Sequence, residues 1–275
     1  MNPTAKQFDL RNAQACAVLS ALAYGRTTLP TNARMLTVPQ TDTHCLVTSS
    51  ADAVVIAFRG TDSIRDWITD AEFLRTKFSC RTGEDMTEVH SGFLAAFDSI
   101  LPALADTLRQ MDAAHSRPII ICGHSLGGAL AALCALELSR QNFNVAQVYT
   151  YGQPRVGNAA FAKLYEAALG DRTFRLVYQE DIVPRVPHLP GLIDPYRHCG
   201  QEVFISSTTA CRTVDDLWFN PPIWRLLVSD AWGIYRAWQI SKFAGALDPI
   251  QDHFIVNYTR ALEGLTASEP QGAIK

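Results

Sequence analysis

Short apolar runs alternate with amphipathic stretches along the middle of this chain. The runs are rich in β-branched residues and predict strands over 43–48, 53–58, 118–122, 145–151, 174–179 and 202–206. Apolar spacing of three and four predicts helices that begin near Ser91 and cover 130–138 and 158–168, with a further helix near the N-terminus. Alternating strands and helices predict an α/β fold, with a mainly parallel central sheet and helices on both faces.

No linker, repeat or low-complexity tract divides the sequence, so we expect one domain over residues 1–275. With 48% hydrophobic and 19% charged residues, the chain can bury a large core. A net charge of -3 gives no electrostatic reason to expect a nucleic-acid partner. The seven cysteines lack metal-ligand spacing and announce no disulfide framework, which favours a reducing compartment; a single disulfide stays an open alternative.

Residues 16–24 are a short apolar stretch with some features of a secretion signal. Ala21-Leu22-Ala23 fits a signal-peptidase site, but polar residues precede the stretch and its apolar core is short. We therefore expect an amphipathic helix packed on the domain. This expectation favours a cytoplasmic location, with secretion as the alternative.

Ser125 stands between the apolar run ending at Cys122 and an Ala- and Leu-rich helix, and Gly123 and Gly127 flank it. A serine on so tight a strand-to-helix turn has a strained backbone, and the residues two positions away must be small. The Gly-x-Ser-x-Gly pattern alone recurs by chance. Its place between a strand and a helix predicts a nucleophile elbow.

A serine nucleophile needs a histidine base and a carboxylate that orients the imidazole. In α/β-hydrolases the acid follows the serine in the chain, after a strand. Asp181 follows the predicted strand 174–179 and is our candidate. Alternation along the chain should turn the side chain of Glu180 away from that of Asp181. Asp194 is a weaker rival, because an aspartate beside a proline is typical of a turn.

The histidines that follow Asp181 are His188, His198 and His253. His188 lies in the same proline-bounded loop. His198 precedes the last predicted strand, at the wrong end of the sheet, and we expect it to make a core hydrogen bond. His253 follows that strand and heads an apolar helical run, so we predict that it is the base.

An oxyanion hole needs two convergent N–H groups. Leu126, directly after the nucleophile, is expected to supply one. Thr61 is expected to supply the other from the end of strand 53–58, where Gly60 permits close approach of the backbone.

A series of sequence blocks resembles, in order, the motifs of the fungal-type class 3 lipases, within the α/β-hydrolase superfamily. The blocks are FRGTDSIRDWITD (58–70), VHSGFLAAF (89–97), GHSLGGALA (123–131), YTYGQPRVGN (149–158), EDIVPRVP (180–187), YRHCGQEVF (196–204) and DHFIVNY (252–258). The resemblance covers roughly residues 45–262. It implies a Ser125–His253–Asp181 triad, an oxyanion hole from Thr61 and Leu126, a lid that begins at SIRDW, and a carboxylic ester hydrolase acting on acylglycerols.

Residues 62–88 contain the expected lid. Ser63 suits a helix N-cap, and Ile64, Trp67 and Ile68 share one apolar side. We expect this side to cover Ser125 in water and to turn toward a transient lipid interface. A surface helix held permanently on the domain is the alternative.

Residues 215–245 form a tryptophan-rich segment that predicts one largely apolar helix. Core packing would explain such a helix. Because the segment leads directly into His253, we also expect Trp232 and Trp238 to wall an acyl-chain pocket.

The predicted chemistry needs neither a metal nor an organic cofactor. A phospholipase A1, a feruloyl-type esterase and a thioesterase of the same fold are alternatives. A hydrolase-like binding protein without turnover is disfavoured, because no triad position is missing. The natural ester, its acyl chain length and the oligomeric state stay open.

Overall fold

The computed structural model describes residues 1–5, 7–62, 74–78, 83, 86–111, 117–187, 196–205, 211–213 and 251–266. Its main element is an eight-stranded sheet in the order β1–β2–β3–β6–β7–β8–β9–β10. These strands are β1 (Ala33–Val38), β2 (Thr43–Ser49), β3 (Val54–Phe58), β6 (Ile119–His124), β7 (Val145–Tyr151), β8 (Thr173–Tyr178), β9 (Gln201–Ile205) and β10 (Cys211–Thr213). Strands β3, β6, β7, β8 and β9 are parallel, and β1, β2 and β10 pair antiparallel at the edges.

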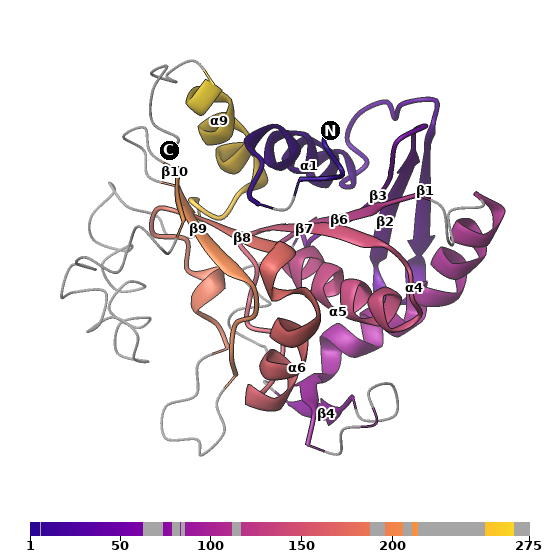
Figure 1. Cartoon of the computed structure of the whole chain (residues 1–275), viewed down its shortest axis with the longest axis vertical. Coiled ribbons are helices and arrows are strands. Elements are labelled where there is room, and N and C mark those ends of the chain that lie inside the picture. The colour runs from indigo at the N-terminus through magenta and orange to yellow at the C-terminus, as the bar shows by residue number, and fades with distance from the viewer. Residues whose placement is uncertain are drawn as a thin grey trace.

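Helices cover both faces of this sheet (Figure 1). On one face lie α1 (Leu10–Leu22) and α9 (Ile255–Thr266); on the other lie α4 (Ser91–Gln110), α5 (Leu126–Arg140) and α6 (Ala159–Leu169). Successive residues of β6 point to opposite faces, so Ile119 and Ile121 join one core while Ile120 and Cys122 join the other. The central strands are therefore buried on both sides, as their unbroken apolar runs predict.

Short 3₁₀ turns and a second small sheet complete the fold. The turns are Pro39–Thr41, Gly170–Arg172 and Val183–Arg185. Strands β4 (Arg75–Lys77) and β5 (Glu88–His90) pair antiparallel, apart from the main sheet.

The sequence prediction locates the ends of the central strands to within two residues but misses strands at the edges. The expectation that 202–206 is the last strand is wrong, because β10 pairs with β9 beyond it. Strands β1, β4, β5 and β10 were also not predicted. Three of these have only three residues, and charged residues such as Arg75 and Arg212 interrupt their apolar pattern; such strands form because a neighbour offers free backbone groups.

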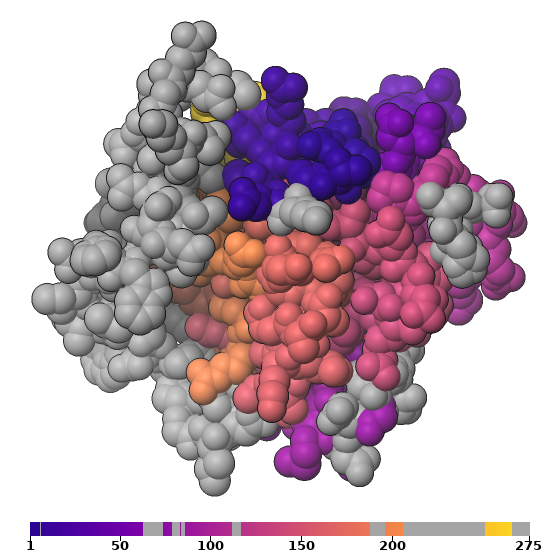
Figure 2. Space-filling view, in the orientation of Figure 1, coloured from indigo at the N-terminus to yellow at the C-terminus, as the bar shows by residue number. Residues whose placement is uncertain are grey.

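The N-terminal helix is part of the folded body, as expected. Ala13, Cys16 and Ala17 of α1 are buried in the core shared with α9. The Asn12 amide donates to the side chain of Gln147 at 2.6 Å, which ties the helix to β7. Figure 2 shows the N-terminal residues, in indigo, lying flush on the body of the molecule.

Several predicted features lie outside the described residues. They are the lid residues Ile64, Trp67 and Ile68, the tryptophan-rich segment 215–245 with Trp232 and Trp238, and the rival candidates His188 and Asp194. In the described part of the chain, no helix has the length and apolar character required to cross a membrane.

Candidate active site

Ser125 lies on a strained turn between β6 and α5. Its backbone has φ 58° and ψ -128°, a conformation that costs a non-glycine residue roughly 1–3 kcal/mol. Two hydrogen bonds hold it there: Ser125 N–H donates to Tyr151 O, and Gly128 N–H donates to Ser125 O, both at 2.9 Å. A Cβ on Gly127 would lie 2.6 Å from Arg59 O, so the turn requires a glycine there. The predicted elbow geometry is present.

Asp181 and His253 form a buried hydrogen-bonded pair. The carboxylate follows β8 and is 0% exposed, and the imidazole precedes α9 and is 2% exposed. His253 Nδ1 lies 3.0 and 2.9 Å from the two carboxylate oxygens. Because an ionised carboxylate only accepts hydrogen bonds, Nδ1 carries the proton and Nε2 is left as an acceptor.

The carboxylate of Asp181 has other donors as well. The Val183 N–H donates to it at 2.9 Å, and the Tyr258 hydroxyl donates at 2.6 Å. Burial and the neighbouring Asp181 raise the pKa of Tyr258, so its hydroxyl keeps the proton that it donates. These contacts hold the carboxylate in one orientation, with an oxygen toward His253.

Two polar atoms of the candidate triad have no hydrogen-bond partner among the described residues. They are Ser125 Oγ and His253 Nε2, and both are buried. Leaving a buried hydroxyl or a buried ring nitrogen without a hydrogen bond costs free energy, and buried atoms elsewhere, such as Ser20 Oγ and Thr150 Oγ1, share this condition. Ser125 Oγ and His253 Nε2 are the two atoms between which a serine hydrolase transfers a proton.

The strand end Phe58–Arg59–Gly60–Thr61 lies directly against Ser125. A Cβ on Gly60 would come within 2.9 Å of Ser125 Cβ. Leu126 begins α5, so its N–H belongs to the first turn, where backbone donors lack an intrahelical acceptor. The segment with Thr61 and the N-terminus of α5 thus flank the serine.

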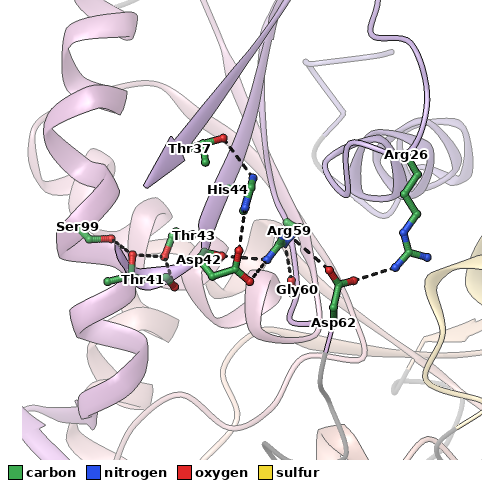
Figure 3. A network of polar contacts seen from close by, with 10 residues as sticks. All are labelled: Arg26, Thr37, Thr41, Asp42, Thr43, His44, Arg59, Gly60, Asp62 and Ser99. Atoms are coloured by element: carbon green, nitrogen blue, oxygen red, sulfur yellow. Dashed lines mark hydrogen bonds and ion pairs between the residues drawn. The ribbon is translucent and has the colours of Figure 1, made fainter. Parts of the chain in front are cut away.

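A polar network holds this strand end in place (Figure 3). Arg59 is only 8% exposed; its Nε donates to Gly60 O, and its Nη2 donates to Asp42 O, each at 3.0 Å. The same guanidinium pairs with the carboxylates of Asp42 and Asp62. Asp62 in turn binds Arg26 at 2.8 Å.

The described rival residues are occupied elsewhere. Glu180 pairs with Arg185 at 2.7 Å. His198 Nε2 donates to Pro184 O at 2.6 Å, the core hydrogen bond expected for it. Burial, followed by the nearby Arg175 and Arg155, lowers the pKa of His198. Among the described residues, no group of histidine, cysteine and acidic side chains could hold a metal.

Known proteins are similar to this chain in sequence. Residues 55–190 match the model of the lipase (class 3) family. The lipase of Rhizomucor miehei is 38% identical over 175 residues, covering 61% of this chain and 46% of that protein. The secreted mono- and diacylglycerol lipase A of Penicillium cyclopium is 36% identical over 172 residues, covering 62% of this chain and 54% of that protein. The chain spans about half the length of these curated relatives.

Solved lipase structures share the fold. The Rhizomucor miehei lipase propeptide complex matches with a TM-score of 0.62 and 30% identity, over 74% of this chain and 70% of that chain. A triacylglycerol lipase whose catalytic centre is a serine protease triad matches with a TM-score of 0.60 and 30% identity, over 74% and 87% of the two chains. The chain belongs to the class 3 lipase family. Its fold is the α/β-hydrolase fold, as the motifs implied.

Sequence reasoning missed several residues around the triad candidates of this member of the class 3 lipase family. Gly152 has φ 59°, and a Cβ there would come within 2.7 Å of both Asp181 Oδ2 and His253 Nδ1. A glycine directly after the predicted strand 145–151 was a signal for a functional turn. No sequence signal pointed to Tyr258 or Arg59, since an aromatic on a helix and an arginine after a strand are common.

The cysteines in the described core of this chain are thiols, not disulfides. Cys16, Cys45, Cys122, Cys134 and Cys199 are free and buried. Cys122 and Cys134 pack as small apolar residues on opposite faces of the sheet.

Proposed function

We propose that this protein is a serine carboxylic ester hydrolase that acts on acylglycerols. The observation that carries the proposal is the buried Asp181–His253 pair, whose unpartnered Nε2 lies at the same edge of the sheet as the unpartnered hydroxyl of Ser125. Ligands of open α/β sheets bind beyond the carboxyl ends of the parallel strands. Ser125, Gly152 and Asp181 follow three neighbouring strands at that edge.

In the proposed mechanism, His253 Nε2 takes the proton of Ser125 as Oγ attacks the ester carbonyl. Asp181 holds the tautomer and stabilises the imidazolium that forms. The imidazolium then protonates the leaving alcohol, which departs and leaves an acyl-enzyme. Water, activated by the same histidine, hydrolyses the acyl-enzyme and restores Ser125.

The negative charge on the tetrahedral oxygen requires donors that are in place before the reaction. We assign this role to the backbone N–H of Leu126 and to the N–H and hydroxyl of Thr61. Loss of one such donor costs on the order of 3 kcal/mol of transition-state stabilisation. The close packing of Gly60 against Ser125 supports this assignment.

Ser125→Ala tests the proposal. We expect the turnover of a soluble 4-nitrophenyl ester to fall by a factor on the order of 10³ or more, with folding intact. Ser20→Ala is the matched control, because Ser20 is also buried and its hydroxyl lacks a partner among the described residues. Wild-type turnover in Ser125→Ala would reject the proposed function.

The names of the relatives support acylglycerols as the substrate class, since they include a triacylglycerol lipase and a mono- and diacylglycerol lipase. We expect hydrolysis of mono-, di- or triacylglycerols to exceed that of a phospholipid or of a thioester with the same acyl chain. Faster cleavage of the sn-1 ester of the phospholipid would favour the phospholipase A1 alternative. Faster cleavage of the thioester would favour a thioesterase.

The relatives also bear on location. Several are named as secreted lipases, which supports the secreted alternative over the cytoplasmic location expected from the sequence. We therefore propose secretion. Detection of the protein in the culture medium of the native host, with a cytosolic enzyme as the lysis control, would test it.

The lid is proposed from the pattern of residues 62–88 and the family. Activity should rise disproportionately once the substrate exceeds its solubility and forms an interface. Trp67→Ser should weaken this rise while leaving turnover of a soluble short-chain ester largely intact. Simple saturation across the solubility limit would contradict a lid.

The acyl pocket of Trp232 and Trp238 is likewise proposed from the sequence pattern. Trp232→Ala or Trp238→Ala should shift the chain-length preference toward a different acyl length, with short-ester turnover largely retained. Variants that unfold would show these side chains to be core. An unchanged chain-length profile in folded variants would remove the pocket.

A further inference from the structure

A tyrosine–histidine pair, with a partly buried Tyr24 and a buried His124, connects the end of the N-terminal helix to the loop that carries His253. The hydroxyl of Tyr24 lies 2.7 Å from His124 Nδ1. On the other side of the ring, His124 Nε2 lies 2.6 Å from the backbone carbonyl oxygen of His253. His124 is 3% exposed and directly precedes Ser125.

The direction of each hydrogen bond follows from the chemistry of the groups. A carbonyl oxygen only accepts, so His124 Nε2 must carry a proton and donate it. Burial and then the nearby His253 lower the pKa of His124, so the ring is neutral and its Nδ1 is an acceptor. The Tyr24 hydroxyl therefore donates to Nδ1; burial, with Asp62 adding to it, raises the pKa of this tyrosine.

We propose that Tyr24 and His124 are positioning residues for the catalytic histidine, in which the tyrosine selects the His124 tautomer that grips the His253 backbone. The inference rests on the proposed function and deepens it. Neither residue touches the ester in this role; both act through His253.

The hydrogen bond from His124 Nε2 to the His253 carbonyl supplies a restraint that Asp181 alone does not supply. Asp181 holds the imidazole of His253 at Nδ1, but an anchor on the ring leaves the backbone of the preceding turn free to shift. The bond to the carbonyl fixes that backbone, so the direction of Nε2 is set at both ends. A neutral His124 is required for a second reason: its ring centroid lies 4.6 Å from that of His253, where a positive charge would oppose the imidazolium.

The same pair contacts the turn on the oxyanion side. A Cβ on Gly60 would come within 2.5 Å of the Tyr24 hydroxyl. Tyr24 is therefore packed between the Gly60 turn and His124, which places one restraint between the two loops that flank Ser125.

Two substitutions of His124 test the inference. His124→Leu removes the donor to the His253 carbonyl, and we expect kcat for a soluble 4-nitrophenyl ester to fall roughly 10- to 100-fold with KM within about twofold. His124→Gln places an amide N–H near the former Nε2 and should recover most of this loss. A His124→Gln variant that is folded and as slow as His124→Leu would overturn the proposal.

Tyr24→Phe alone keeps the proposal testable if His124→Leu is poorly stable, and a double-mutant cycle of the two substitutions tests their coupling. Tyr24→Phe removes the donor that selects the tautomer, and we expect a several-fold lower kcat. In the His124→Leu background Tyr24→Phe should have no further effect on kcat, because its partner is gone. An undiminished effect there would overturn the proposal.

Tyr149→Phe is the matched control, since Tyr149 is a buried tyrosine whose hydroxyl bonds to the backbone of Asp9, away from His253. Tyr149→Phe should lower the melting temperature about as much as Tyr24→Phe does, and it should leave kcat unchanged. A kcat loss in Tyr149→Phe equal to that in Tyr24→Phe would reduce the pair to a general structural role. Inactive Ser125→Ala together with full activity in His124→Leu would reject this inference while leaving the proposed function intact.

Discussion

Two buried charged groups hold the loops on either side of Ser125, and their surroundings differ. Asp181 is 0% exposed, and its side chain is held from inside the protein by the Val183 N–H, the Tyr258 hydroxyl and the His253 imidazole. Arg59 is 8% exposed, but its carboxylate partners Asp42 and Asp62 have side chains that are 70% and 56% exposed.

This difference in exposure predicts which contacts of Asp181 and of Arg59 contribute most to stability. An internal partner that loses its counterpart pays the full cost of desolvation, because no water replaces it. An exposed carboxylate is screened and rehydrates readily, so its ion pair contributes little. We therefore expect the Asp181 side to be sensitive at every contact. The Arg59 side should be sensitive to the arginine and tolerant of changes in its acids.

The largest effect is expected from Asp181→Asn. The amide leaves the shape nearly unchanged but can hold His253 in the wrong tautomer, so kcat should fall by a factor on the order of 10⁴. Ester turnover measures this loss of kcat, and thermal unfolding checks that the variant is folded. Glu180→Gln is the matched control and should retain most activity, since Glu180 pairs with Arg185 instead. Equal losses in both variants would contradict the assignment of the acid.

Arg59→Met is expected to have the next largest effect. The change leaves the Gly60 and Asp42 carbonyls without their donor, and each such loss costs about 1–3 kcal/mol of unfolding free energy. The turn at Gly60 and Thr61 should become less rigid as well, and we expect kcat to be roughly tenfold lower. Chemical denaturation and ester kinetics test this against Arg34→Met, an arginine whose hydrogen bond to Gln110 is exposed. If Arg59→Met matched Arg34→Met, the network would not support the turn.

His90 tests the cost of burial for a group outside the proposed chemistry. Burial lowers the pKa of His90 from 6.5 to about 4, so between these values the unfolded chain binds more protons than the folded protein. The unfolding free energy should then fall as pH falls through this window, by at most about 1.4 kcal/mol per pH unit for this group. His90→Asn keeps an N-cap acceptor for Gly92 and removes the titration, so it should reduce the slope of unfolding free energy against pH. An unchanged slope would show that His90 does not contribute.

Asp42→Asn should have the smallest effect. Its carboxylate is exposed, while the contact between Asp42 O and Arg59 is made by the backbone and survives the substitution. We expect less than about 1 kcal/mol of lost unfolding free energy, reduced further by salt, and unchanged kcat. A loss comparable to that of Arg59→Met would remove the contrast between the two sides of the serine.

Local patterns in the sequence determined the fold class, the central strands and the triad candidates. The apolar runs before Ser125 and Asp181 mark buried parallel strands, and residues that follow such strands gather at one edge of a sheet. Chain order then indicated Asp181 and His253, and alternation along the strand favoured Asp181 over Glu180. The inferences about fold class and strands are confirmed, because strand burial and side-chain alternation are properties of neighbouring residues, whereas the triad assignment stays a proposal.

Only the tertiary structure decided how these candidates are held. The partners of His124, Tyr24 and the carbonyl of His253, lie 100 and 129 positions away in the chain, and Tyr258 is 77 positions from Asp181. Gly152 is needed because two side chains from distant segments meet above it. Arg59 follows β3 and acts through the backbone of Asp42, which directly precedes the neighbouring strand β2. Such contacts leave no periodic trace, because they depend on which segments the packed sheet and helices bring together.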